Sequence, residues 1–253
     1  MALPFVGRVS ASRRDRAAPD AMTIWEHLSE LRRRLLVSVA AFVVAGCVAA
    51  VFYNREITFL QHPYCAINPR DCGFYLTNPL GPLTLRIKLA AFSGLILASP
   101  VLLWELWRFI TPGLNRTEKR YAVPFVIASI TLFLVGCAIV YVILPHTLGW
   151  LIHIGGPHLH ELLNPQSYLT LILLLMLIFG LTFEFPVVLV ALQLAHVVTP
   201  AALLRAWRWA VIGITVAAGV FTPSSDPFSM CALAVPLVVF YFGAIGVGKL
   251  LMR

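Results

Sequence analysis

The chain has 253 residues, of which 60% are hydrophobic and 12% are charged, and its formal net charge is +8 at pH 7. An ordinary soluble domain has about 25% charged residues, so this chain has too few charged side chains to cover a soluble surface. The composition therefore excludes a soluble globular domain and predicts an all-α polytopic membrane protein, in which most apolar side chains face lipid or other helices.

The positive charge does not indicate nucleic-acid binding, because the lysines and arginines lie in clusters between apolar runs. Such clusters set membrane topology, whereas a nucleic-acid interface needs a continuous basic patch. We expect contact with membrane lipid and no nucleic-acid partner.

The N-terminal segment 1–21 is basic and lacks the apolar core of a cleavable signal peptide. We expect a disordered cytoplasmic tail there and a six-span membrane domain over residues 22–253. The predicted spans are about 35–53, 83–107, 121–144, 168–194, 207–221 and 228–250. The fifth has about 15 residues, or roughly 22 Å at helical rise, against a bilayer core of about 30 Å. We therefore expect local thinning of the bilayer or burial of this span against other helices.

Basic residues are concentrated before the first span, in the second and fourth connections and at the C-terminus. Because cytoplasmic loops carry the excess of Lys and Arg, both termini are predicted to be cytoplasmic.

Cys65 and Cys72 then lie together in the first outward-facing loop, on the side of the membrane that is oxidising in bacteria. A disulfide between them is the prediction, and two unpaired thiols are the alternative.

The stretch MTIWEHLSELRRRLL predicts a helix start, because Thr23 and Glu26 have the spacing of a capping box. Glu30 and Arg34 form an i,i+4 pair in the favourable order. We interpret this stretch as an interfacial helix leading into the first span. That interpretation leaves Glu26 and Glu30 unexplained, and a role in binding a partner is the hypothesis for them.

The connection WELWRFITPGLNRTEKRYAVP joins the second and third spans. Trp104, Trp107 and Tyr121 are typical of the aromatic belt at a membrane interface. Glu118 stands where the third span should begin, and a carboxylate suits a helix N-terminus. From spacing alone, a capped helix start and a binding role remain equally open.

In the last outward turn, Asp226 before Pro227 predicts a helix N-cap, with a second role left open.

The apolar run FGLTFEFPVVLVAL contains Glu184 two residues before Pro186. Pro186 cannot donate to the carbonyl of Thr182, so the fourth span should kink there. Glu184 lies about 24 Å along the span from Tyr168, nearer the cytoplasm, and must face protein or water rather than lipid. The alternatives are a buried hydrogen-bonded carboxyl and a polar spot that lines a cavity. Glu184 and Gln193 are also predicted points for docking a partner helix.

The sequence contains no GxxxxGK, HExxH or GxSxG motif, so we expect neither an enzyme nor a bound cofactor. His153, His158 and His160 lie in the outward-facing stretch HIGGPHLHELL, where one HxH is a weak metal signal. We therefore predict no metal site.

Four blocks carry a resemblance to one family, in the family's order. They are HLSELRRRL at His27–Leu35, LWELWRFITPGLNRTEKR at Leu103–Arg120, FGLTFEFPVV at Phe179–Val188 and FTPSSDPFS at Phe221–Ser229. Over about residues 23–250 the chain resembles the TatC family, the receptor subunit of the twin-arginine protein translocase.

The resemblance implies a concave arrangement of six helices with short fifth and sixth spans, in a bacterial cytoplasmic membrane. It implies binding of twin-arginine signal peptides and export of folded proteins by the proton-motive force, without nucleotide. It also implies multimers that include single-span subunits of the TatA and TatB types.

Carried over by position, Glu30 and Glu118 match the family's acids that bind the paired arginines of the signal peptide. Two carboxylates can bind guanidinium groups bidentately, which lysine cannot match. Glu184 matches the family's intramembrane acid. Other matching positions are Arg32, Phe109 and Pro100 near the cytoplasmic site, Pro63 and Lys88 near the first outward loop, and Asp226 in the last outward turn.

Three features depart from the family pattern: Glu105 near the end of the second span, the Cys65/Cys72 pair and a very short C-terminal tail.

The alternative function is a proton-coupled small-solute transporter with Glu184 as the proton relay. It explains the cytoplasmic acids poorly, and the sequence lacks a repeated broken-helix pattern.

Overall fold

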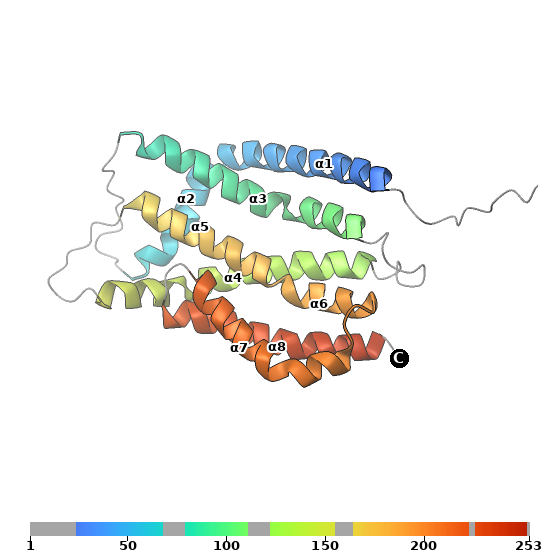
Figure 1. The fold of residues 1–253 in the computed structure, drawn as a ribbon. Coiled ribbons are helices and arrows are strands. Elements are labelled where there is room, and N and C mark those ends of the chain that lie inside the picture. The colour runs from blue at the N-terminus through green and yellow to red at the C-terminus, as the bar shows by residue number, and fades with distance from the viewer. Residues whose placement is uncertain (1–23, 68–78, 111–121, 155–163, 223–225, 252–253) are drawn as a thin grey trace, which may run out of the picture.

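The structure is a computed structural model that describes residues 24–67, 79–110, 122–154, 164–222 and 226–251 (Figure 1). These residues form helices and short connections, with no strand among them. The helices are α1 (Ile24–Val51), α2 (Tyr53–Cys65), α3 (Gly81–Ile110), α4 (Ala122–Ile154), α5 (Pro165–Thr182), α6 (Phe185–Leu194), α7 (Pro200–Phe221) and α8 (Pro227–Leu251).

Within the described ranges, six segments are long and apolar enough to cross a membrane, as predicted. They are Leu28–Val51, Gly81–Phe109, Val123–Leu151, Pro165–Leu194, Pro200–Phe221 and Pro227–Leu251. Because the number of spans is even, α1 begins and α8 ends at the same end of the bundle (Figure 1).

The prediction of a fifth span too short to cross the membrane was wrong. α7 begins at Pro200 rather than Trp207 and has 22 residues, enough for a span of about 33 Å. Arg205 and Arg208 had marked the end of the apolar run, but both are exposed on a continuous helix, where long side chains can reach the interface. The 25-residue sixth span is not short either, although both remain shorter than the second, third and fourth.

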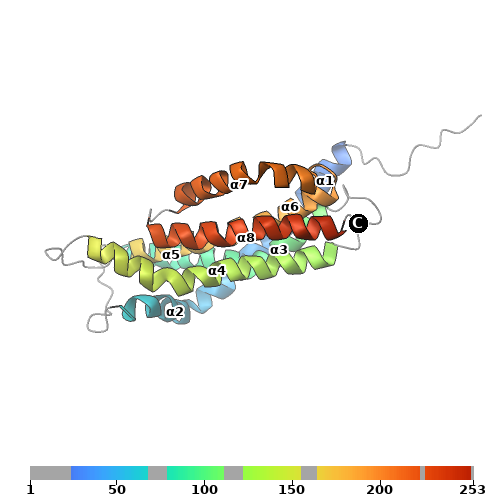
Figure 2. The ribbon, with the colours of Figure 1, turned by 90° about the horizontal axis from the view of Figure 1, so that it is seen from below.

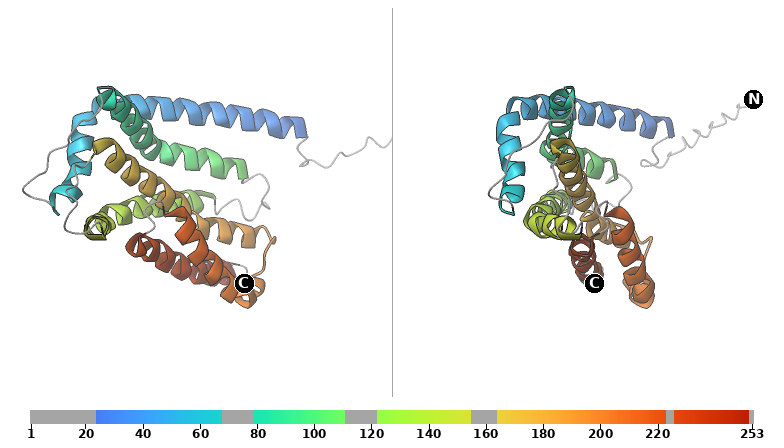
Figure 3. Two further views of the ribbon diagram at one scale, coloured as in Figure 1. Left: turned by 60° about the vertical axis from the view of Figure 1, so that its left-hand side comes forward. Right: turned by 90° about the vertical axis from the view of Figure 1, so that its left-hand side faces the viewer.

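Two other predictions about the N-terminal half change. The interfacial helix and the first span form one continuous 28-residue helix, α1. The stretch after it, predicted as a loop, contains the 13-residue helix α2. α2 turns across the end of the bundle where α3 and α5 begin (Figure 3). Pro63 lies inside this helix, a position that is unfavourable for proline.

The helices are unequally buried, which decides where a site can form. The span formed by α5 and α6 is the centre of the main core: half of its most apolar part is buried, against 11% for the spans of α1 and of α7. α1 packs along α3, and α8 has α7 on one side and α4 on the other (Figure 2). α1 and α7 are therefore peripheral helices held by one neighbour each.

Glycines bring α1 and α3 together. A Cβ added to Gly94 would lie 2.6 Å from the Cα of Gly46, closer than carbon atoms approach. Small residues allow such close backbone contact between membrane helices, where lipid removes most of the hydrophobic driving force.

We predict that Gly94→Leu separates α1 from α3 and lowers the unfolding temperature in detergent, since overpacking costs about 1–3 kcal/mol. Gly246→Leu is the control, because a Cβ there meets no atom within 4 Å. Equal unfolding temperatures for the two variants would contradict this account of the contact.

Candidate functional site

The first candidate site is an ion cluster between α1 and α3. Arg34 bonds to Glu30 one turn earlier on α1, as its spacing predicts, with Nε 3.1 Å from Glu30 Oε1. Its Nη1 lies 3.1 Å from Oε2 of Glu105 on α3. The three side chains are 14%, 24% and 15% exposed for Arg34, Glu30 and Glu105 respectively. Two carboxylates from two helices therefore share one guanidinium in a half-buried position.

Glu105 is the residue that sequence reasoning missed in this cluster. It had been noted only as a departure from the family pattern. The available signal was its charge within the otherwise apolar end of a span, which requires a partner. That partner, Arg34, is 71 residues away in sequence, so spacing could not identify it.

The other residues predicted for this site are only partly brought together. Arg32 is exposed on α1, and Phe109, the next-to-last residue of α3, is half-buried. Pro100 is exposed within α3 and leaves the carbonyl of Ile96 without its helical donor. The hydroxyl of Ser99 donates to that carbonyl at 2.7 Å. Glu26 has no described side chain, and Glu118 lies outside the described residues.

The second candidate site surrounds Glu184. The predicted kink is confirmed, because α5 ends at Thr182 and α6 begins at Phe185, with Pro186 in its first turn. Glu184 stands at the break and is 9% exposed. Glu184 lines a groove of about 680 Å³ between the α5–α6 break and α7. Apart from Thr182, the other lining residues are apolar or glycine, and Leu237 of α8 is one of them.

Of the two interpretations of Glu184, the structure supports the polar spot that lines a cavity. The Glu184 Oε1 atom has no partner among the described residues, and Glu184 is the charged residue among those that line the groove. The groove therefore has a mainly apolar lining with one carboxyl group, that of Glu184.

Trp107 does not belong to an aromatic belt, contrary to the prediction, because only 4% of it is exposed. Its indole Nε1 donates to Ser129 Oγ at 2.7 Å. Trp104 is 43% exposed, as a residue of an aromatic belt would be. The only sequence signal for Ser129 was one serine in the apolar run FVIASITLF, which does not reveal its partners.

Gln193 joins two helices of this chain, α6 and α8, and is not exposed to a partner helix. It is completely buried, and its Nε2 donates to the carbonyl of Ala244 on α8 at 3.1 Å. It lies against Gly248, where an added Cβ would collide with the amide. Its buried position corrects the prediction that it offers a surface to a partner.

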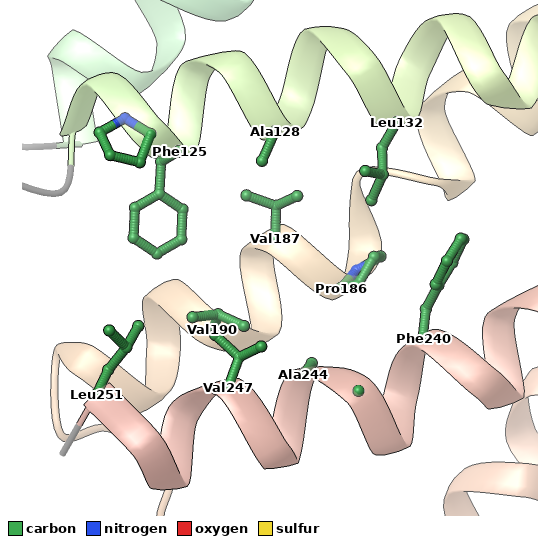
Figure 4. Close-up of a pocket in the computed structure, with 12 residues that line it drawn as sticks. Phe125, Ala128, Leu132, Pro186, Val187, Val190, Phe240, Ala244, Val247 and Leu251 are labelled. Atoms are coloured by element: carbon green, nitrogen blue, oxygen red, sulfur yellow. The ribbon is translucent and has the colours of Figure 1, made fainter. Parts of the chain in front are cut away.

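A second hollow, of about 380 Å³, lies between α4, α6 and α8 (Figure 4). In Figure 4, Val187 of α6 faces Ala128 of α4, and Phe240 and Val247 extend from α8. All the residues that line it are apolar or glycine, so it offers no group for catalysis or for a polar ligand.

The predictions for the outward end have mixed outcomes. Asp226 caps α8, since its Oδ1 accepts from the backbone N–H of Ser229 at 2.7 Å. Cys65 is disulfide-bonded, while Cys47, Cys137 and Cys231 are free. Cys72 lies outside the described residues, so the pairing stays a prediction.

Two residues near the first outward loop have structural contacts. Lys88 donates to Thr170 on α5 at 3.2 Å, and Pro63 is buried in α2. His153 bonds to the carbonyl of Gly149 one turn earlier, and His158 and His160 lie outside the described residues. No group of three or more metal-ligating side chains occurs in the part of the chain that the structure describes.

Comparison with known proteins identifies the family. The family model for the Sec-independent protein translocase protein (TatC) matches residues 26–236. The chain belongs to the TatC family. Over 98% of its length it is 39% identical to the TatC protein of Frankia casuarinae, covering 72% of that protein. Over 92% of its length it is 34% identical to that of Aquifex aeolicus, covering 97%.

The fold agrees with this family. A crystal structure of the twin-arginine translocase receptor TatC in DDM has a TM-score of 0.75 and 34% identity, covering 88% of this chain and 99% of that one. As a TatC protein the chain is a multi-pass membrane component of a Sec-independent protein translocase and not a catalytic enzyme. The small-solute transporter alternative receives no support from the family.

We predict that Asp226→Ala lowers the unfolding temperature, because the loss of an N-cap costs about 0.5–2 kcal/mol. Asp226→Asn retains an acceptor for the Ser229 N–H and should unfold near the wild-type temperature. If both variants unfold like the wild type, the cap does not stabilise α8; if Asn is as unstable as Ala, the charge matters rather than the bond.

Proposed function

We propose that this chain is the signal-peptide receptor of a bacterial twin-arginine translocase, in the cytoplasmic membrane with both termini inside. It binds twin-arginine signal peptides with Glu30 and Glu118. It then nucleates assembly of the complex, with TatA- and TatB-type subunits and further copies of itself, that exports folded proteins by the proton-motive force.

The observation that carries the proposal is the pair of acids held at Arg34. Glu30 and Glu105 share one guanidinium at the end of the bundle where α1 begins and α3 ends, so these carboxylates already bind a guanidinium group there. A guanidinium group of a signal peptide can bind the same carboxylates through charge-assisted hydrogen bonds, which are stronger than neutral ones. Glu118 follows the end of α3 by eight residues in the sequence and is a third acid in this part of the chain.

Arg34 makes the site selective for guanidinium groups over other cations. A ligand must compete with an intramolecular guanidinium, so a single lysine ammonium, which cannot bind bidentately, is at a disadvantage. Phe109 and Pro100 shape the end of α3 near this cluster. Arg32 is exposed and has the same sign as the ligand, so we assign it to acidic or carbonyl groups that flank the arginines.

The groove at Glu184 suits a single-span partner helix. Its wall is apolar like a transmembrane helix, and its one acid offers an acceptor to a polar residue on that helix. Because α7 forms one wall and is itself held mainly by α8, it can adjust to a helix that enters. We assign the groove to a TatA- or TatB-type subunit.

Binding of a twin-arginine signal peptide tests the proposal directly. Glu30→Gln and Glu118→Gln should each lower the affinity of the full-length chain about tenfold or more, since hydrogen bonds to charged groups contribute about 1.5–3 kcal/mol. Glu56→Gln is the matched control, an acid on α2 at the other end of the bundle. A peptide with two lysines should bind weakly to all four proteins.

Wild-type affinity in the Glu30→Gln/Glu118→Gln double variant would contradict the receptor assignment. An equal loss in Glu56→Gln would show that the effect is a general one of charge and not of this site.

A further inference from the structure

The cluster around Arg34 has the form of a binding site that is already occupied. Nε and Nη2 of Arg34 both donate to Oε1 of Glu30, and Nη1 donates to Oε2 of Glu105 at 3.1 Å. The donors of one guanidinium are therefore divided between acids on two helices. A guanidinium binds a carboxylate most strongly through two parallel bonds to its two oxygens, whereas Arg34 here reaches one oxygen of each acid.

The half-buried position of these side chains makes an unpaired charge costly. Arg34 and Glu105 have only 14% and 15% of their side chains exposed. Removing one partner from such a pair leaves a charge that water cannot fully solvate, and this penalty exceeds what an exposed ion pair returns. A peptide that took both carboxylates would leave Arg34 unpaired. A bound state in which every guanidinium keeps one carboxylate is therefore favoured.

The bond between Arg34 and Glu105 is not needed to hold the two helices in register. α1 packs along α3, and a Cβ added to Gly94 would collide with the backbone of Gly46. Gly46 lies 12 residues after Arg34, and Gly94 lies 11 residues before Glu105, so both contacts belong to one antiparallel register. The glycine contact, about 17 Å away at helical rise, fixes that register, and the ion cluster can exchange its partners without loss of it.

We propose that Arg34 is an internal occupant of the signal-peptide site and that Glu105 is the positioning residue that keeps it when the peptide binds. In the free chain Arg34 bridges Glu30 and Glu105. When an arginine of the peptide binds Glu30, Arg34 stays with Glu105 and pairs with both of its oxygens, so two guanidinium groups face two carboxylates. This inference rests on the proposed role of Glu30 and adds Glu105 and Arg34 to the site.

The exchange accounts for a preference for arginine over lysine. A peptide side chain must replace two guanidinium donors, Nε and Nη2, at the carboxyl group of Glu30. Another guanidinium presents the same planar pair of donors, whereas an ammonium group is a compact and more strongly hydrated point charge. The competition disappears without Arg34, and the preference for arginine should then become smaller.

A double variant distinguishes this role from direct contact with the peptide. Glu105→Gln should weaken binding of a twin-arginine peptide to the full-length chain about tenfold, because Arg34 loses its second acid and holds Glu30 more firmly. Arg34→Gln/Glu105→Gln should regain at least the wild-type affinity, because the competitor is removed as well. A double variant as weak as Glu105→Gln overturns the inference, since Glu105 would then bind the peptide itself or support the fold.

The single variant Arg34→Gln tests the competition. It should bind the twin-arginine peptide about tenfold more tightly than the wild type and should discriminate less against a peptide with two lysines. Arg33→Gln is the matched control, because Arg33 carries the same charge but is exposed next to the cluster. Equal affinities and equal discrimination in the two variants overturn the inference, since the effect would then be one of net charge.

The Nε–H resonance of Arg34 reports the exchange itself. In the full-length chain labelled with ¹⁵N-arginine, this resonance is the one that Arg34→Gln removes. Saturation with unlabelled twin-arginine peptide should shift it, because Nε leaves Oε1 of Glu30. A resonance that stays in place in the fully bound chain overturns the inference.

The variant Glu30→Gln separates this inference from the function on which it rests. If Glu30→Gln binds the peptide like the wild type, the proposed receptor role of Glu30 fails and the exchange fails with it. If Glu30→Gln binds weakly but Arg34→Gln/Glu105→Gln is not rescued, the receptor role stands and the exchange alone is overturned.

Discussion

The burial of a carboxyl group inside a membrane span, at Glu184, is the constraint on which the rest of this structure depends. A carboxylate there costs about 2.5–3.5 kcal/mol on insertion scales. Its Oε1 atom is buried and has no hydrogen-bond partner among the described residues, so the fold gives the acid little compensation for that cost. Pro186 breaks the span beside it, and the break lets Glu184 line a groove instead of facing lipid. An acid that is merely tolerated by the fold is best explained by what enters that groove.

The last turns of α3 hold two neighbouring helices in place. Glu105 and Trp107 are two residues apart, so on a helix their side chains point in nearly opposite directions. Glu105 reaches Arg34 on α1, and Trp107 reaches Ser129 on α4. A single short helical segment therefore bonds to α1 through Glu105 and to α4 through Trp107. The glycine contact between α1 and α3 keeps the first of these in place, and the small core around Trp107 keeps the second.

The sequence was sufficient for features with a local cause and insufficient for those that need a distant partner. Apolar length identified the six spans, Pro186 identified the kink, and spacing identified the Glu30–Arg34 pair and the Asp226 cap. Glu105, Ser129 and Trp107 were missed or misread because their partners lie on other helices, and α7 was shortened because two arginines interrupt its apolar pattern without ending the helix. Gln193 looked like an external docking point because a sequence cannot distinguish the two sides of an apolar helix.

The central claim is that the groove beside Glu184 receives a partner helix. Gly213 of α7 lines the groove, and a Cβ added there meets no atom within 4 Å, so Gly213→Leu fills the groove without disturbing its walls. The measurement is the yield of crosslinking of a single-span partner to a photoreactive residue at Val188, on the groove wall, in Gly213→Leu, with Gly246→Leu on the outer face of α8 as the matched control. The account predicts loss of the crosslink in Gly213→Leu, with signal-peptide binding retained and Gly246→Leu like the wild type. An unchanged crosslink in Gly213→Leu would contradict it.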